Sequence, residues 1–305
     1  MKDYSTIEIY LFLQKIFLYE ESIYFKIKSL LSYKFNSNSE LKYAVDLYCN
    51  NVTYKYACNN YFYIFLWDTS KITNMSHLFE NHKNFNEYIN CWDVSNVEDM
   101  SSMFKDCTNF NQPLNLWNVG NVKNMNSMFN TCTMFNRNIN SWDVSNVINF
   151  SFMFECCDNF NQPLDLWDVS KAVDMYFMFA ETSDFNQNLN SWDISSVRIL
   201  EGMFIDCNSY NQPLDLWDVS NVENLSRMFY NCPKFNQPLD SWKLNDSKII
   251  ASILKYCQNF NQPLHSWIIS DINNYEIFSN SGLHIDNYPP WHDEEELVDF
   301  IFFKS

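Results

Sequence analysis

Six aspartates follow tryptophans at intervals that are multiples of 25 residues, which gives a row of carboxylates able to bind calcium. They are Asp68, Asp93, Asp143, Asp168, Asp193 and Asp218, and Asn118 takes the intervening position. Carboxylates stacked a few ångströms apart repel one another, so each needs a hydrogen bond or a cation. An aspartate can also close an Asx turn by accepting a backbone N–H from the residue two positions later. The sequence favours the turn, with calcium binding as the alternative.

Six of the ten cysteines recur at the same interval. They are Cys107, Cys132, Cys157, Cys207, Cys232 and Cys257, and the aligned positions elsewhere hold His82 and Thr182. A cysteine that recurs at a small, apolar position is typical of a buried thiol that packs like alanine. Disulfides between units or a zinc site are the alternatives. No CxxC pair is present, so the sequence predicts buried free thiols.

Catalysis finds little support in the remaining polar residues. The five histidines stand in different units, without a neighbouring serine or cysteine nucleophile motif. They are His77, His82, His265, His284 and His292. No glycine-rich phosphate loop, HExxH motif or paired-carboxylate signature stands out. The sequence therefore predicts a protein that is not an enzyme and that uses no cofactor.

The interval itself comes from a tandem repeat. Nine tryptophans stand 25 residues apart: Trp67, Trp92, Trp117, Trp142, Trp167, Trp192, Trp217, Trp242 and Trp267. A fixed period of this length predicts a solenoid, in which each unit buries its apolar face against its neighbours. Function is then expected on a long surface, not in a pocket.

Each unit has two apolar segments. The first spaces its apolar residues like an extended segment with a bend, as in Leu114, Trp117, Val119 and Val122. The second has the i, i+3, i+4, i+7 spacing of a two-turn helix capped by Asn124, as in Met125, Met128, Phe129 and Cys132. The expected fold is an α/β repeat solenoid of leucine-rich-repeat-like form, with one short parallel strand and one short helix per coil. Phe129 and Phe154 are predicted to be core residues, and Asn130 and Glu155 to be surface residues.

One asparagine is constant across eight units: Asn86, Asn111, Asn136, Asn161, Asn186, Asn211, Asn236 and Asn261. Its amide is expected to bond turn backbone in the next coil, as asparagine ladders do.

The motif decays toward both ends of the chain. We expect residues 1–60 to form a helical N-terminal cap and entry segment, with helical spacing over residues 6–33. Residues 61–280 are expected to form a solenoid of about nine 25-residue repeats. Residues 281–305 are expected to form a C-terminal cap, with a short helix after Pro290.

The unit at residues 217–241, WDVSNVENLSRMFYNCPKFNQPLDS, resembles the 25-residue repeat of the BspA-like leucine-rich-repeat family, which occurs in bacteria, protists and large DNA viruses. The resemblance covers about residues 61–280. It implies adhesion or protein binding, functions that family members are mostly assigned by analogy. The chain departs from the exported members because it has no lipoprotein signal. We therefore expect an intracellular interaction protein, with a viral source among the candidates and with display on a surface or virion as the alternative.

The net charge is −17 and the sequence pI is about 4.5. An acidic surface repels nucleic acid and anionic membranes, so we expect neither as a partner and favour a basic protein. Charged residues interrupt the N-terminal apolar clusters, which excludes a membrane-spanning helix there on sequence grounds.

Two sets of surface residues are candidates for binding. The first is the variable column, defined as Thr73, Glu98, Lys123, Ile148, Val173, Arg198 and Glu223. The second is the leucine column, Leu116, Leu166 and Leu216, which recurs every 50 residues. The leucines are either anchors for a partner or the remnant of a duplicated pair of units. The predicted function is a non-catalytic protein–protein interaction scaffold, and the alternative is an adhesin-like or structural protein that binds a host protein or glycan.

Overall fold

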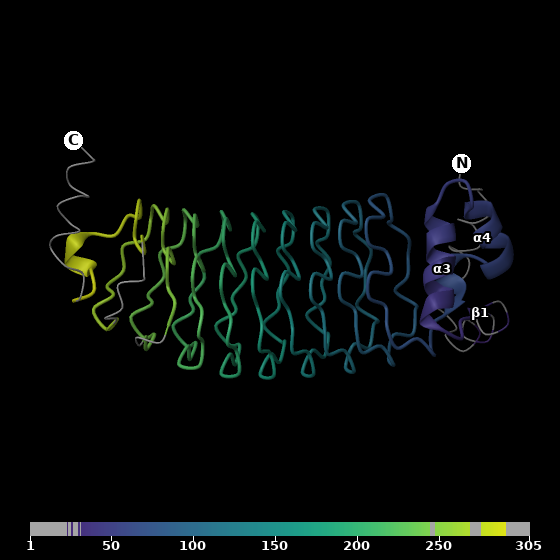
Figure 1. Ribbon diagram of the computed structural model, residues 1–305, viewed down its shortest axis with the longest axis horizontal. Helices are drawn as coiled ribbons and strands as arrows, with labels where there is room; N and C mark the ends of the chain where they lie inside the picture. The colour runs from purple at the N-terminus through teal and green to yellow at the C-terminus, as the bar shows by residue number, and fades with distance from the viewer. Residues whose placement is uncertain are drawn as a thin grey trace.

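The computed structural model describes residues 32–244, 248–268 and 276–290, together with Ile23, Lys26 and Leu30, which are helical. Successive coils lie one behind another along the long axis, with helices at the N-terminal end (Figure 1). Most of the helical segment expected within residues 6–33, and the helix expected after Pro290, lie outside the described residues.

The N-terminal elements cover the first coil. They are β1 (Tyr33–Lys34), α3 (Asn38–Cys49), α4 (Tyr54–Tyr61), η1 (Ile64–Leu66) and β2 (Trp67–Asp68). Strand β1 pairs with β2 in parallel, with Tyr33 opposite Trp67. The Ser37 hydroxyl accepts the Glu40 N–H and caps α3. The rings of Phe35 and Tyr48 lie 5.0 and 5.7 Å from the Trp67 ring, so these elements cover the first tryptophan.

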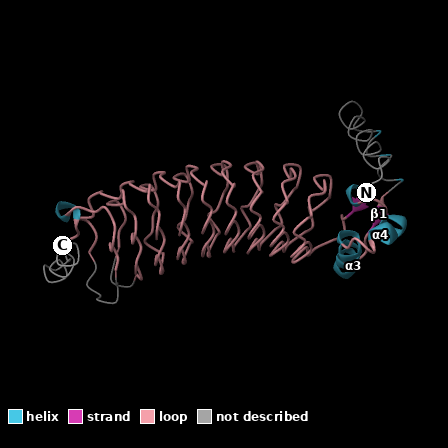
Figure 2. Cartoon of the chain, turned by 90° about the horizontal axis from the view of Figure 1, so that it is seen from above, coloured by secondary structure: helices cyan, strands magenta, loops and turns pink. Residues whose placement is uncertain are grey.

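The short helix predicted in each coil is wrong for the described coils. Residues 100–106 form a series of turns, and Figure 2 draws the coils as loops throughout. The N–H groups of Met103 and Cys107 bond carbonyls three residues back, at 3.2 and 2.9 Å. The N–H groups of Ser102 and Phe104, which alternate with these, donate to backbone carbonyls of the next coil, at 2.8 and 2.9 Å. Ser102 has φ of 54°, so the chain visits the left-handed region between turns.

The inward positions of this segment are nevertheless as predicted. Met100, Met103, Phe104 and Cys107 are fully buried, as are Met125, Met128, Phe129 and Cys132 in the next coil. A run of overlapping four-residue turns, each closed by a bond from an N–H to the carbonyl three residues back, returns side chains to one face every three or four residues, as a helix does. The surface assignment of Asn130 is wrong, because this residue is buried and its amide donates to Glu155 of the next coil.

The predicted strand is also reduced. Leu114, Trp117, Val119 and Val122 are buried, but the N–H groups of Trp117 and Val122 close turns at 3.1 and 2.9 Å. Parallel pairing between described coils is confined to single bridges. They join Asn74, Asp99, Asn124, Asn149, Asp174, Ile199, Asn224 and Ile249 in succession.

Aromatic rings stack along the axis and form one continuous core. The rings of Phe104 and Phe129 have centroids 5.5 Å apart and planes 4° apart. The indoles of Trp117 and Trp142 have centroids 6.4 Å apart and planes 4° apart. The core reaches from Phe35 to Leu283, so each coil is buried by its neighbours.

Buried donors tie each coil to the preceding one. The Cys132 thiol donates to the Phe104 carbonyl at 3.0 Å, and the Thr182 hydroxyl donates to the Phe154 carbonyl at 2.5 Å. The prediction of buried free thiols is confirmed, since all six cysteines of the column are buried and all ten are free. The predicted comparison of these cysteines with alanine was incomplete, because every member of the column except His82 is a small side chain that donates to the preceding coil. This explains why threonine replaces cysteine at Thr182.

The asparagine ladder is confirmed. The Asn136 side-chain oxygen accepts the Asn161 N–H at 3.1 Å, and the Asn161 oxygen accepts the Asn186 N–H at 3.0 Å. At the C-terminal end, the Asn261 oxygen accepts the His284 N–H at 2.8 Å, just before η2 (Ile285–Asn287). The ladder therefore continues past Trp267, the last tryptophan of the 25-residue series.

Candidate binding surface

The aspartates after tryptophan close Asx turns, as predicted. The Asp168 carboxylate accepts the Ser170 N–H at 3.0 Å, and the Asn118 amide oxygen accepts the Gly120 N–H at 3.2 Å. Hydrogen bonds from the Ser170 hydroxyl and N–H lower the pKa of Asp168. Among the described residues, no group of three or more His, Cys, Asp or Glu side chains is arranged to hold a metal ion.

The variable column is exposed and lies on a hydrogen-bonded frame. The Lys123 N–H donates to the Glu98 carbonyl at 2.8 Å, and the Ile148 N–H donates to the Lys123 carbonyl at 2.9 Å. Bonds of this kind connect its members from Thr73 to Glu223. The fold thus places residues 25 positions apart side by side.

The charged members of the column pair with each other. The Lys123 ammonium lies 2.7 Å from the Glu98 carboxylate, and the Arg198 guanidinium lies 3.7 Å from the Glu223 carboxylate. Between the two pairs, Ile148 and Val173 are 47% and 39% exposed. The column therefore presents an apolar centre with an ion pair on either side. Exposed ion pairs contribute little to the free energy of folding, so the stability of the stacked coils does not account for this arrangement of charged and apolar residues.

The leucine column is exposed as expected. Leu116, Leu166 and Leu216 are 53%, 70% and 72% exposed. The backbone beneath these leucines has contacts with the same 50-residue period, since the Asn140 side chain accepts the Leu166 N–H at 3.1 Å and donates to the Asp165 carboxylate at 2.9 Å. Asn190 makes the same two contacts one pair of coils later, and Asn90, one pair earlier, accepts the Leu116 N–H and donates to the Asn115 side-chain oxygen. Each of these asparagines therefore connects its own coil to the following one by two hydrogen bonds, while the leucine side chains remain at the surface.

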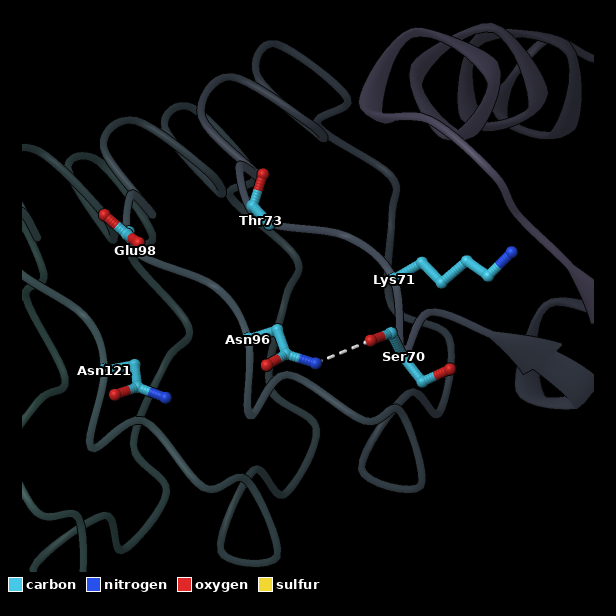
Figure 3. A pocket seen from close by; sticks show the side chains of 6 residues that line it. All are labelled: Ser70, Lys71, Thr73, Asn96, Glu98 and Asn121. Carbon is cyan, nitrogen blue, oxygen red and sulfur yellow. Dashed lines mark hydrogen bonds between the residues drawn. The ribbon is translucent and has the colours of Figure 1, made fainter.

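A polar hollow that the sequence did not reveal lies at the N-terminal end of the variable column (Figure 3). It measures about 440 Å³ and is lined by Ser70, Lys71, Thr73, Asn96, Glu98 and Asn121. The Asn96 amide donates to the Ser70 carbonyl at 2.8 Å, and Asn121 repeats this bond to Ser95 at 2.7 Å. Lys71 extends toward the N-terminal elements and donates to Asn36 at 2.9 Å. These groups can hydrogen-bond a ligand, but they include no nucleophile paired with a base.

Within the described residues, no helix is long and apolar enough to cross a membrane.

A family model described as "Mycoplasma protein of unknown function, DUF285" matches residues 50–166, 148–267 and 190–287. These overlapping segments run without a gap from residue 50 to residue 287, which is more than half of the chain. The chain belongs to the DUF285 family. Three matches within one DUF285 chain agree with a repeat architecture, and they cover the described coils. Comparison with curated proteins and with solved structures gave no match.

Proposed function

We propose that this DUF285 chain is a non-catalytic protein-binding scaffold built on a repeat solenoid. The observation that carries the proposal is the variable column. Its side chains change from coil to coil, whereas the backbone beneath them is fixed by hydrogen bonds of 2.8 to 2.9 Å between successive members. A rigid frame with variable surface residues suits recognition, because little ordering is needed on binding. The exposed Ile148 and Val173 supply apolar area at its centre, and the flanking ion pairs supply orientation.

The resemblance to BspA-like repeats supports the same function, since members of that family are mostly assigned adhesion or protein binding. The net charge of −17 favours a basic partner. We propose an intracellular setting. The leucine column offers further apolar contacts on alternate coils.

An adhesin-like role is the second candidate. The polar hollow favours it, because the amides of Asn96 and Asn121 and the Glu98 carboxylate are the kinds of group that hydrogen-bond sugar hydroxyls. This role requires export from the producing cell.

The two functions are separated by cross-linking in the producing cells. A tagged full-length chain is compared with an Ile148→Ser/Val173→Ser variant and with a Val52→Ser/Ile268→Ser control, whose residues are exposed outside the column. The scaffold function predicts that a protein is recovered with the wild type and the control and is lost with the column variant. Equal recovery with all three chains would overturn it. Recovery of the chain outside the cell, with binding to a glycan array, would favour the adhesin-like role.

A further inference from the structure

Three aromatic side chains stand on a surface that carries small polar residues in the preceding coils. Phe152, Tyr176 and Phe177 are half-buried. The ring centroids of Phe152 and Tyr176 are 4.9 Å apart, and those of Tyr176 and Phe177 are 4.4 Å apart. The rings of Phe152 and Phe177 are 5.9 Å apart. We call these three residues the aromatic patch.

The stack itself does not need aromatic residues here. The equivalent positions in the two preceding coils hold Ser101, Ser102, Asn126 and Ser127. Asn126 and Ser127 hydrogen-bond each other at 3.1 Å, and Asn126 also donates to the Ser151 hydroxyl at 2.5 Å. Small polar side chains therefore satisfy these positions.

The backbone is unfavourable for such large side chains. Phe152 and Phe177 have φ of 57° and 54°, in the left-handed region that bulky residues seldom adopt. In the next coil Gly202 has φ of 59°, and a Cβ there would lie 2.4 Å from a ring carbon of Phe177. The missing Cβ makes room for the Phe177 ring. The same left-handed backbone recurs at Ser102, Ser127 and Arg227, so the stack imposes the conformation, and the choice of phenylalanine at two of these positions calls for a reason outside the stack.

Carboxylates lie near the aromatic patch, and that of Asp174 accepts the Tyr176 N–H at 2.9 Å. Burial is the main cause of the raised pKa of Tyr176, and Glu201, Glu155 and Asp174 raise it further through their charge. The positive charge of Arg227 opposes this effect.

The nearby glutamates have only uncharged side-chain donors. Glu155 and Glu201 accept hydrogen bonds from the amides of Asn130 and Asn224, and the Cys156 thiol donates to Glu181 at 3.7 Å. In the part of the chain that the structure describes, none of these three glutamates forms an ion pair with lysine or arginine.

We propose that the aromatic patch, with Glu155, Glu181 and Glu201, binds an arginine-bearing segment of a protein partner. This proposal rests on the scaffold function and names the chemistry of the ligand. A guanidinium stacks on an aromatic face and makes two parallel hydrogen bonds to a carboxylate, whereas a lysine ammonium makes only point contacts. The excess of negative charge on the chain attracts such a segment from a distance.

The test uses the full chain and fluorescein-labelled peptides that alternate glycine with arginine, lysine or glutamate. Binding is followed by fluorescence anisotropy at physiological ionic strength. The first variant is Phe152→Ser/Tyr176→Ser/Phe177→Ser, because serine already occupies equivalent positions in other coils. The second is Glu155→Gln/Glu181→Gln/Glu201→Gln, which keeps the aromatic rings.

A third variant controls for net charge. Asp93→Asn/Asp143→Asn/Asp193→Asn removes three charges elsewhere, and Asn118 shows that asparagine closes the same turn. Melting temperatures establish that each variant is folded. If the serine variant does not fold, the glutamine variant alone decides the outcome.

The expected result is binding of the arginine peptide, several-fold weaker binding of the lysine peptide, and no binding of the glutamate peptide. The serine and glutamine variants are expected to weaken arginine-peptide binding by about tenfold, and the aspartate control by less than about twofold. Equal weakening in the glutamine variant and the aspartate control, with unchanged binding in the serine variant, would show diffuse charge attraction and overturn the proposal, as would unchanged binding in a folded glutamine variant. If the peptide test fails while the Ile148→Ser/Val173→Ser variant still loses a cellular partner, the scaffold function stands without this site.

Discussion

The indole N–H of Trp142 donates to the backbone carbonyl of Leu114 at 3.0 Å, across a separation of 28 residues. The same carbonyl also accepts the backbone N–H of Trp117 at 3.1 Å. Each tryptophan therefore closes a turn with its N–H and ties that turn to the preceding coil with its ring. The bond recurs from Trp92 to Trp267, which is the physical reason for a 25-residue tryptophan period.

Replacing Trp142 separates its hydrogen bond from its packing. Trp142→Phe keeps an aromatic ring in the stack but removes the donor, and it should lower the free energy of unfolding by about 1–2 kcal/mol. Trp142→Ala also leaves a cavity and should cost about 3–5 kcal/mol. Urea unfolding followed by near-ultraviolet circular dichroism measures both. Equal losses would show that the hydrogen bond, not the packing, dominates.

Tyr210 carries the one buried side-chain polar atom without a hydrogen-bond partner in the described part of the chain. Its ring stacks 6.0 Å from Phe185 and 6.2 Å from Phe235, in a column that is otherwise phenylalanine. Because an unpartnered buried hydroxyl loses its hydration without compensation, Tyr210→Phe should stabilise the chain by about 1 kcal/mol. Phe185→Tyr serves as the reverse control and should destabilise it. A destabilised Tyr210→Phe variant would indicate a partner for the hydroxyl, such as an internal water.

Asx turns make stability depend on acid pH. Hydrogen bonds from Ser170 and Ser220 lower the pKa of Asp168 and Asp218 below the ordinary value of 3.8. A pKa that is lower in the folded chain gives stability that is present above about pH 4 and is lost as the pH falls through the folded value. Asp168→Asn/Asp218→Asn keeps the turns and should flatten the acid side of a plot of melting temperature against pH. An unchanged acid side would mean that other carboxylates control acid unfolding.

Calcium provides a separate test of the same column. Since local N–H groups already bond the carboxylates, millimolar calcium should change the melting temperature by no more than about a degree. A rise of several degrees that EDTA reverses, and that Asp168→Asn/Asp193→Asn abolishes, would reveal cation sites. That outcome would favour the adhesin-like function.

Deletions test the coil register. Removing residues 143–167 takes out one 25-residue coil and keeps the inward columns aligned, whereas removing residues 143–154 shifts every later column. Removing residues 143–192 takes out a coil pair and also preserves the pairing between Asn140 and an aspartate, because Asp215 then takes the place of Asp165. We expect melting temperatures in the order 50-, 25- and 12-residue deletion, from highest to lowest. A 12-residue deletion that melted at the highest temperature of the three would contradict stacked coils.

The sequence predicted which residues are inside and failed to predict the local backbone, for one physical reason. Met125, Met128 and Phe129 have a spacing that brings side chains to one face both in a helix and in a run of overlapping four-residue turns. The two structures differ in the acceptors of every second backbone N–H group. In this protein those acceptors are carbonyls of the next coil, 24 residues away in the sequence. Among the described residues Gly202 is the one glycine at a left-handed position, and the equivalent positions in other coils hold residues such as Ser102, Ser127, Phe152 and Phe177, which give no sign of a positive φ.

The site was partly predictable for a related reason. Exposure of Leu166 and of the variable column follows directly from the repeat pattern. The aromatic patch is less evident, because Phe152 and Phe177 are read as core residues unless they are compared with the serines at the same position in other coils. The assignment of Asn130 failed because its buried amide is satisfied by Glu155, a residue of another coil.

The hydrogen bonds between coils run along the long axis of the molecule, as in the pair Phe129 to Met153 at 2.9 Å. Tension applied between the two ends is therefore carried by one layer of bonds after another. A stacked coil occupies roughly 5 Å of the long axis, which is the spacing of paired strands. After it detaches, its 25 residues can extend to as much as about 85 Å. The chain should thus unfold one coil at a time when it is pulled from its ends. The force should then rise and fall regularly with extension, and the number of peaks should report the number of coils.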